Sequence, residues 1–158
     1  MWKDCKNGCK FCFNKGLPDI SKLDSLNFVI EKIEDPEMNR FNEIGFIGGE
    51  FFDDQLNTIE VKNKFYELFN KVCSIINSGK MNKLYVTSSL IFKNQISILE
   101  FLDFLKKNNC ITKTLLCTSY DSIGRFHTDE HKSMWIRNMK EIHIKYPELK
   151  LHTEIIIT

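Results

Sequence analysis

Ile44-Gly45-Phe46-Ile47-Gly48-Gly49 is a short apolar run that ends on two glycines. A run of this length, followed by residues that permit a sharp turn, predicts a buried β-strand and then a tight backbone turn. Apolar side chains recur at helical spacing over about residues 58–77, and Gly79 offers a C-terminal stop for that helix. The apolar run at residues 84–87 predicts the next strand. Residues 44–87 are therefore predicted to form a strand, a helix and a second strand.

The same alternation continues on both sides of this unit. Toward the C-terminus, spacing predicts helices over residues 95–107 and 131–145, and strands over residues 112–118 and 151–157. Toward the N-terminus, a helix over about residues 21–34 ends at Asp35-Pro36, and residues 1–20 are expected to form a loop. Alternating strands and helices predict an α/β fold with a mostly parallel sheet. We expect residues 1–158 to form a single domain.

Composition narrows the classes of function. The chain has 158 residues, of which 42% are hydrophobic and 27% charged, so it can bury a core. The formal net charge of +1, from 22 basic and 21 acidic residues, gives no support for binding nucleic acid or an anionic membrane. No apolar run approaches the roughly 20 residues that span a bilayer. With no recognisable signal peptide, we expect a cytoplasmic protein.

Cysteines are concentrated at the N-terminus. Cys5, Cys9 and Cys12 have the spacing C-x3-C-x2-C, and Phe11 directly precedes the last of them. Clustered cysteines in a reducing compartment favour metal binding or catalysis over disulfides. Thiolates are the usual ligands of iron–sulfur clusters, normally four for a [4Fe–4S] cluster. Three ligands on one loop leave one iron with an open coordination position, where a metal site performs chemistry. The spacing therefore predicts a catalytic [4Fe–4S] site.

Two alternatives remain open at this point. A structural zinc site would need a fourth ligand from Cys73, Cys110 or Cys117, because no histidine lies near the loop. The cysteines could also form disulfides or be incidental thiols. Outside the loop, the other three cysteines are expected to be ordinary thiols, with Cys117 buried in a strand.

The pattern Cys5-x3-Cys9-x-Phe11-Cys12 resembles the CxxxCxΦC signature of the radical S-adenosylmethionine (SAM) superfamily, in which Φ is an aromatic residue. The resemblance implies a partial (β/α) barrel with its site at the carboxyl ends of the strands. It also implies that a [4Fe–4S] cluster binds SAM and cleaves it reductively to a 5′-deoxyadenosyl radical, which abstracts hydrogen from a substrate. Such an oxidoreductase-like enzyme needs an electron donor such as flavodoxin or ferredoxin. Phe11 would shield the cluster or pack on the adenine.

A second motif follows the first predicted strand. Gly48-Gly49-Glu50 is similar to the GGE motif of the family, and the resemblance implies that these three residues contact the amino group of SAM. The residue types suit that role, since glycines let a backbone approach a ligand and a carboxylate accepts from an ammonium. Thr87-Ser88-Ser89 ends the next strand, and the resemblance implies that small polar residues here, Ser88 first among them, contact the adenosine or methionine part of SAM. The alternative is a strand end followed by a helix cap, where Ser and Thr are common.

A third motif follows the strand predicted at residues 112–118. Ser119-Tyr120-Asp121 resembles the S-x-D of many family members, which implies that Ser119 hydrogen-bonds SAM and that Asp121 faces the substrate or holds the loop. Arg125 is expected to grip the SAM carboxylate, because arginine suits bidentate binding of carboxylates. His127 is expected to be a solvated loop histidine. The S-x-D resemblance favours a peptide or protein substrate, with a small molecule left open.

The chain also departs from the family pattern. Only residues 1–4 precede Cys5, so we expect this chain to lack the first strand of the barrel, together with the last strand and the segment G-x-I-x-G-x-x-E. We therefore expect an incomplete barrel, either a fragment or a chain completed by another component. These departures keep two rival functions open. One is a truncated, non-catalytic iron–sulfur or metal-binding module, and the other is an electron carrier with a fourth cysteine ligand.

Overall fold

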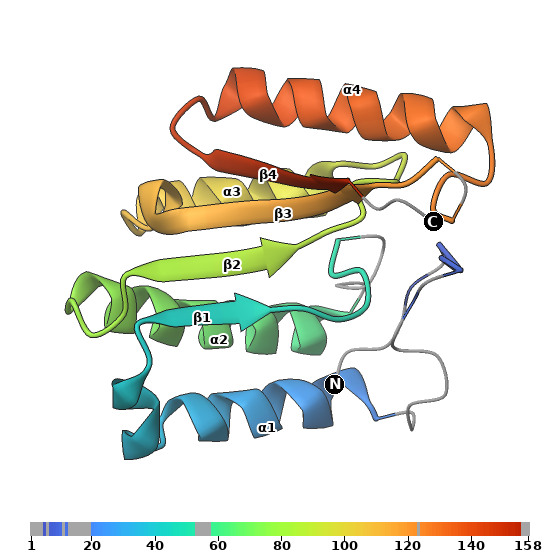
Figure 1. Cartoon of the computed structure of the whole chain (residues 1–158). Coiled ribbons are helices and arrows are strands. Elements are labelled where there is room, and N and C mark those ends of the chain that lie inside the picture. The colour runs from blue at the N-terminus through green and yellow to red at the C-terminus, as the bar shows by residue number, and fades with distance from the viewer. Residues whose placement is uncertain are drawn as a thin grey trace.

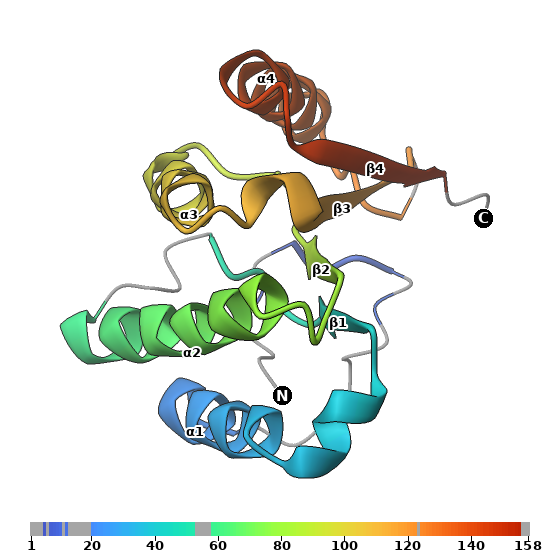
Figure 2. The ribbon, with the colours of Figure 1, turned by 90° about the vertical axis from the view of Figure 1, so that its left-hand side faces the viewer.

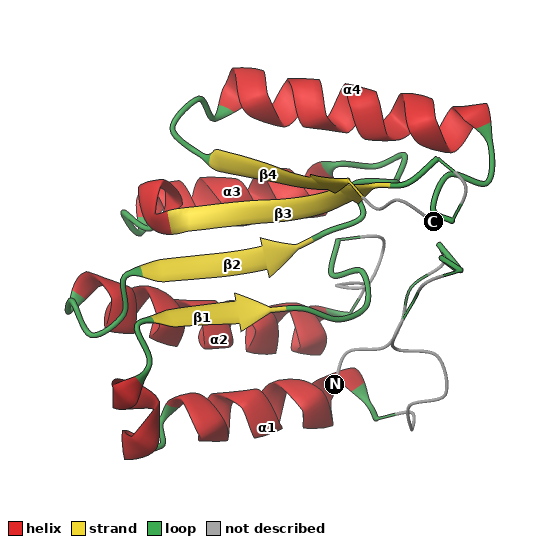
Figure 3. Cartoon of the chain, in the orientation of Figure 1, coloured by secondary structure: helices red, strands yellow, loops and turns green. Residues whose placement is uncertain are grey.

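A computed structural model describes residues 5, 7–10, 12, 20–52, 58–122 and 124–155. Helices and strands alternate along the described chain, which confirms the predicted α/β class (Figures 1 and 3). In order, the elements are α1 (Lys22–Ile33), the 3-10 helix η1 (Pro36–Arg40), β1 (Glu43–Phe46), α2 (Ile59–Asn77), β2 (Lys83–Thr87), α3 (Ile96–Lys107), the 3-10 helix η2 (Ile111–Lys113), β3 (Thr114–Tyr120), α4 (Asp129–Lys145) and β4 (Lys150–Ile155).

The four strands form one parallel sheet in the order β1-β2-β3-β4. Because neighbours in the sheet are also neighbours in sequence, each connecting helix crosses over in the same sense. Right-handed crossovers of this kind place their helices on one face of the sheet. Figure 2 shows α2 and α3 on the same side, with α1 beside α2. The carboxyl ends of all four strands therefore meet at one edge.

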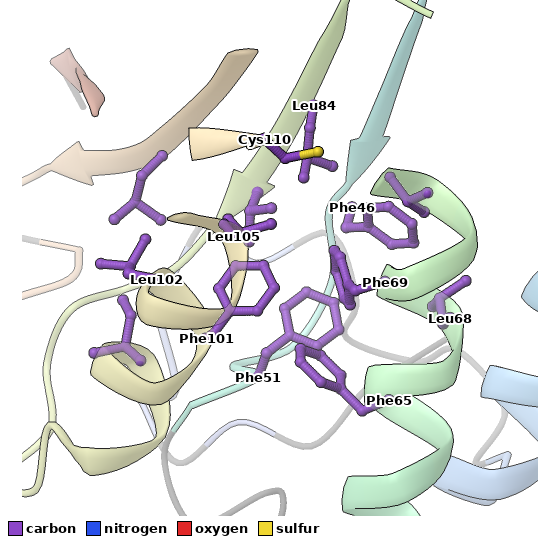
Figure 4. Packing of buried hydrophobic residues seen from close by; sticks show 14 of the residues in the cluster. Phe46, Phe51, Phe65, Leu68, Phe69, Leu84, Phe101, Leu102, Leu105 and Cys110 are labelled. Carbon is purple, nitrogen blue, oxygen red and sulfur yellow. The ribbon is translucent and has the colours of Figure 1, made fainter. Parts of the chain in front are cut away.

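The covered face of the sheet carries the main core. Phe46 and Val86 pack there against α2 and α3, whose Phe65, Phe69 and Phe101 are almost completely buried (Figure 4). The ring centroids of Phe69 and Phe101 are 4.7 Å apart, as are those of Phe65 and Phe69. Burying one such side chain stabilises a fold by about 1.5–3 kcal/mol. This aromatic layer fixes the helices against β1 and β2, the strands that lead into the candidate site.

The opposite face of the sheet is open in the described part of the chain. Tyr85 and Thr87 of β2, and Leu115 and Cys117 of β3, are half-buried and alternate with fully buried neighbours. β4 contains no fully buried residue. This alternation is the signature of a sheet packed on one side only. No helix of the described residues is long and apolar enough to cross a bilayer.

Two details differ from the predicted elements. The strand expected at residues 112–118 begins at Thr114 and continues to Tyr120, so Ser119 lies within β3 rather than after it. The preceding residues form η2, because the main-chain N–H of Lys113 bonds back to the carbonyl of Cys110 at 3.1 Å. Ile111 is buried in this turn and is as apolar as a strand residue. This explains why the strand was predicted to begin too early.

Candidate functional site

One pocket lies where the carboxyl ends of β1 and β2 meet the N-terminal cysteine loop. The described residues that line it are Cys5, Asn7, Cys9, Cys12, Ile47, Gly48, Gly49, Glu50, Thr87, Ser88, Ser89 and Arg125. They come from four separate parts of the chain: the cysteine loop, the turn after β1, the turn after β2, and the loop between β3 and α4. Figure 1 shows the described part of the cysteine loop beyond the arrowheads of the strands.

The cysteine loop is attached to the loop between β3 and α4. The main-chain N–H of Lys10 donates to the carbonyl of Gly124 at 3.0 Å. The Nε2 atom of His127 lies 2.7 Å from the carbonyl oxygen of Asn7. Because a carbonyl only accepts, this nitrogen is the protonated one. Both bonds hold residues between Cys5 and Cys12 in place.

Three features shape the loop from within. Gly8 has a φ of 57°, a left-handed conformation that side chains disfavour. The main-chain N–H of Cys12 donates to the carbonyl of Cys9 at 3.2 Å, which closes a turn between these two cysteines. The side chain of Asn7 donates from Nδ2 to the Sγ of Cys5 at 3.4 Å. A donor directed at a cysteine sulfur suits a thiolate ligand, because hydrogen bonds to sulfur are part of how proteins tune iron–sulfur clusters.

Burial favours the protonated form of two of the thiols, Cys5 and Cys9. Desolvation raises the pKa of Cys5, opposed mainly by hydrogen bonds from Asn7. Desolvation also raises the pKa of Cys9, opposed by the positive charge of Arg125. A metal centre bound here would displace these protons, so its affinity would rise with pH. Arg125 is thus close enough to the loop to favour negative charge on Cys9.

Glu50 joins the turns after β1 and β2. Its side chain is 1% exposed, and its Oε1 accepts from the Ser88 hydroxyl at 2.9 Å and from the main-chain N–H of Phe52 at 3.2 Å. Its Oε2 accepts from the main-chain N–H of Ser89 at 2.6 Å. Burial raises the pKa of Glu50, and these donors oppose that rise. The carboxylate therefore fixes the two turns relative to each other.

Asp121 and Arg125 occupy different positions in the loop after β3. Asp121 is buried, and its Oδ1 accepts from the main-chain N–H of Gly124 at 2.8 Å, so it holds the turn. That turn presents the next residue, Arg125, to the pocket. Ser119 is buried within β3, in register with Glu154 of β4. Neither Ser119 nor Asp121 is among the described residues that line the pocket.

Most of the predicted site residues therefore converge. The three cysteines, Gly48-Gly49-Glu50, Ser88 and Arg125 line one pocket, and Phe11 lies outside the described residues. Asn7 is a pocket residue that the sequence did not predict. His127, expected to be a solvated loop histidine, is exposed, and its Nε2 also bonds the Asn7 carbonyl. Thr87 and Ser89, which flank Ser88 in the predicted motif, line the pocket as well. Asn7 carries a weak signal, since it is a polar residue between two cysteines. His127 carries none, because its role depends on contact with a segment 120 positions away.

Sulfur is the main donor that the pocket offers to a metal, but its three thiols are not drawn together on one point. Three cysteine thiols line one wall, and the one carboxylate in the lining, Glu50, is already hydrogen-bonded. Within the described ranges, no three His, Cys, Asp or Glu side chains are grouped closely enough to hold a single metal ion. Comparison with protein-family models and with curated proteins finds no match to the chain.

Proposed function

We propose that the chain is the core of a radical SAM enzyme in which Cys5, Cys9 and Cys12 hold a [4Fe–4S] cluster. One observation carries the proposal. The C-x3-C-x2-C loop and Gly48-Gly49-Glu50, which are distant in sequence, line the same pocket at the carboxyl ends of parallel strands. Parallel β/α proteins bind ligands at that edge. The sequential strand order and the single helix-covered face support a partial barrel as the architecture.

The proposed chemistry belongs to the cofactors. When bound, the cluster would supply the electron that cleaves SAM to methionine and a 5′-deoxyadenosyl radical, which removes hydrogen from the substrate. Each cysteine of the loop would ligate one iron, and the fourth iron would remain open to SAM. The S-x-D resemblance favours a peptide or protein as the substrate. The electron would come from a donor such as flavodoxin or ferredoxin.

The residues of the chain would position SAM and keep the site in shape. Gly48 and Gly49 have no side chains, so the main chain of this turn can approach a ligand closely. Glu50 fixes this turn against Ser88 and Ser89, whose main chains form the adjoining wall. SAM carries an ammonium group, and the carboxylate of Glu50 is the acceptor in the lining that matches it.

The loop after β3 would recognise the other charged group of SAM. Arg125 lines the pocket, and its positive charge reaches Cys9. A guanidinium in the lining of the pocket suits the SAM carboxylate, which it could bind with two parallel hydrogen bonds. Asp121 would act indirectly, through the Gly124 main chain that precedes Arg125. Ser119 is buried within β3 and is not among the described residues that line the pocket, so we propose no contact between it and SAM.

A second candidate is a non-catalytic iron–sulfur module that does not bind SAM. The state of Glu50 favours it, because both carboxylate oxygens already accept hydrogen bonds from Ser88, Ser89 and Phe52. A ligand ammonium would have to share these oxygens. The two candidates differ in SAM binding, and an experiment on SAM therefore separates them.

The deciding experiment is anaerobic cluster reconstitution of the full chain, followed by dithionite and SAM and an assay for 5′-deoxyadenosine. We expect 5′-deoxyadenosine from the wild type and from Cys117→Ser, whose cysteine is not among the described residues that line the pocket. We expect none from Cys9→Ala. A cluster whose spectrum SAM does not perturb, with no 5′-deoxyadenosine formed, would establish the non-catalytic module. Binding of zinc alone would disprove both.

A further inference from the structure

A second pair of cysteines lies at the edge of the sheet opposite to the pocket. Cys73 is on α2, near its C-terminus, and Cys110 directly precedes η2 and β3. Their exposed fractions are 2% and 0%, and Cys110 belongs to the main core together with Leu84 and Leu105 (Figure 4). β2 and α3 separate the two cysteines in sequence. The fold nevertheless places Cys73 and Cys110 next to each other.

The two residues are in contact. The Sγ of Cys110 lies 3.7 Å from the carbonyl oxygen of Cys73 and 3.8 Å from the Oδ1 of Asn77, and its thiol can donate to either oxygen. Disulfides require side chains that already point toward each other from closely spaced main chains. The contact of the Cys110 Sγ with the main chain of Cys73 brings the two residues within reach of such a bond.

The environments of the two sulfurs differ. A hydrogen bond from Cys73 and the positive charge of Lys113 lower the pKa of Cys110, with burial opposing them. The Nζ of Lys113 is held nearby, since it donates to the carbonyl of Ile76 at 3.2 Å. The same thiol–thiol hydrogen bond, together with burial, raises the pKa of Cys73. Because thiolates are the reactive form, Cys110 is the nucleophile of the pair and Cys73 is its resolving partner.

We propose that Cys73 and Cys110 form a reversible intramolecular disulfide when the chain meets a peroxide. The Cys110 thiolate attacks one peroxide oxygen, the O–O bond breaks, and the departing hydroxide takes a proton to become water. The sulfenic acid on Cys110 then accepts attack by the Cys73 sulfur. The S–O bond breaks, the S–S bond forms, and a second water leaves with the remaining proton. In total, two thiols lose two electrons and two protons, and the peroxide is reduced to two waters.

Oxidation requires the segment around Cys110 to open. Asn109 has a φ of 55°, the left-handed conformation in which asparagine often ends a helix, and η2 has only three residues. The Nδ2 of Asn77 donates to the carbonyl of Asn108 at 2.8 Å, and the main-chain N–H of Cys110 donates to the carbonyl of Leu105 at 2.9 Å. Opening of this short segment breaks these bonds but does not require global unfolding. The disulfide would then link α2 to the connection between α3 and β3.

The test uses the apo full chain, reduced with dithiothreitol, freed of it and titrated with hydrogen peroxide before alkylation and tryptic mapping. We expect residues 72–80 and residues 108–113 to appear as one cross-linked product that dithiothreitol splits. The cysteines of the N-terminal loop and Cys117 fall in other peptides, so their oxidation is counted separately. Recovery of Cys73 and Cys110 as alkylated thiols, at peroxide levels that oxidise Cys117, would overturn the proposal.

Two variants test the order of the steps. In Cys73→Ser, the sulfenic acid on Cys110 has no resolving thiol and should be trapped by dimedone. In Cys110→Ser, Cys73 should remain a thiol at the same dose. A dimedone adduct on Cys73 instead of Cys110 would contradict the assigned roles. Cys117→Ser is the matched control and should form the same cross-linked product as the wild type.

Discussion

The imidazole Nε2 of His127 donates a hydrogen bond of 2.7 Å to the main-chain carbonyl oxygen of Asn7, across 120 positions of sequence. Asn7 lies midway between Cys5 and Cys9, so this bond reaches the centre of the cysteine loop. A second hydrogen bond, from the Lys10 N–H to the Gly124 carbonyl, joins the same two segments. The loop after β3 therefore supports the cysteine loop through these two hydrogen bonds. Its residues can affect the positions of the cysteines without binding a metal themselves.

We predict that His127→Ala loosens the cysteine loop and leaves the fold intact. Loss of one hydrogen bond of about 0.5–1.5 kcal/mol should raise the population of the open loop about 2- to 12-fold. The rate of alkylation of Cys9, which is buried, should rise by that factor in apo protein. Mass spectrometry of the alkylated peptides at fixed pH measures the rate. Iron incorporation after reconstitution should fall in parallel.

The control for this variant is His143→Ala, which removes an exposed histidine from α4. It should leave both the alkylation rate and the iron content at their wild-type values. His127→Gln keeps a donor and should recover part of the protection. If His127→Ala and His143→Ala alkylate at the same rate, the hydrogen bond to Asn7 does not hold the loop.

Glu50→Ala should destabilise the apo protein by about 2–3 kcal/mol. The substitution leaves the main-chain N–H groups of Phe52 and Ser89 and the Ser88 hydroxyl buried without their acceptor, and each buried unsatisfied donor costs about 1–3 kcal/mol before the site relaxes. Urea unfolding measures the change. Glu31→Ala, at an exposed position of α1, should alter the free energy of unfolding by less than about 0.5 kcal/mol.

A double-mutant cycle with Ser88→Ala isolates the contact between Glu50 and Ser88. Side chains that share a hydrogen bond couple by about 0.5–3 kcal/mol, so the two substitutions together should cost less than the sum of their separate effects. Additive effects would mean that the Ser88 hydroxyl does not stabilise the carboxylate, and the two turns would then be joined only by main-chain donors.

The sequence contains most of the information that builds the scaffold. Leu26, Ile30 and Ile33 recur at helical spacing and are buried in α1, and the Oγ of Ser21 caps that helix by accepting from the Asp24 N–H at 3.1 Å. Gly79 ends α2 with a φ of 80°, as its residue type predicts. Local periodicity and caps are short-range properties, which is why these elements could be predicted residue by residue.

The site could be predicted only in part, because its contacts are long-range. The cysteine spacing and the Gly-Gly-Glu turn identify the residues that face the pocket, but no local pattern indicates that His127 reaches Asn7. The same limit applies to Glu50, whose residue type suits a ligand and whose carboxylate is nevertheless bonded to Ser88 and Ser89. Such contacts form only when loops that are distant in sequence come together. The folded sheet determines which loops do so.

Asn138 supports the segment that follows Ser88 and Ser89. It is completely buried on α4, and its Nδ2 donates to the carbonyls of Leu90 at 2.9 Å and Phe92 at 3.0 Å. Leu90 has a φ of 56°, so this segment has a conformation that needs outside support. We predict that Asn138→Ala costs about 2–4 kcal/mol and that hydrogen exchange of residues 88–92 accelerates.

Asn138→Asp should be more damaging than Asn138→Ala at neutral pH. Aspartate places a buried negative charge beside two carbonyl oxygens and removes both donors, whereas alanine only leaves the carbonyls unsatisfied. Lys140→Ala, at an exposed position of the same helix, should be close to neutral. If Asn138→Ala is as stable in urea unfolding as Lys140→Ala, the donors of Asn138 are not what holds the segment.

Tyr146 and Asp103 give a pH-dependent link between α4 and α3. The Tyr146 hydroxyl donates to the Oδ1 of Asp103 at 2.7 Å, and this bond, followed by Lys145, lowers the pKa of Asp103. A carboxyl whose pKa is lower in the folded state stabilises the fold above its unfolded pKa of about 3.9, and that stabilisation is lost as the pH falls through the folded pKa.

We therefore predict that Tyr146→Phe costs about 1 kcal/mol at pH 7 and less below pH 3. Phenylalanine keeps the buried ring, so the core stays filled and the change isolates the hydroxyl. At low pH the carboxyl is protonated in both proteins, and the hydroxyl has lost its charged acceptor, although it still bonds the Leu99 carbonyl at 3.1 Å. Urea unfolding of both proteins between pH 2.5 and pH 7, taken as a difference, cancels every other titrating group. A difference that stays constant over this range would mean that the hydroxyl stabilises the fold through Leu99 alone.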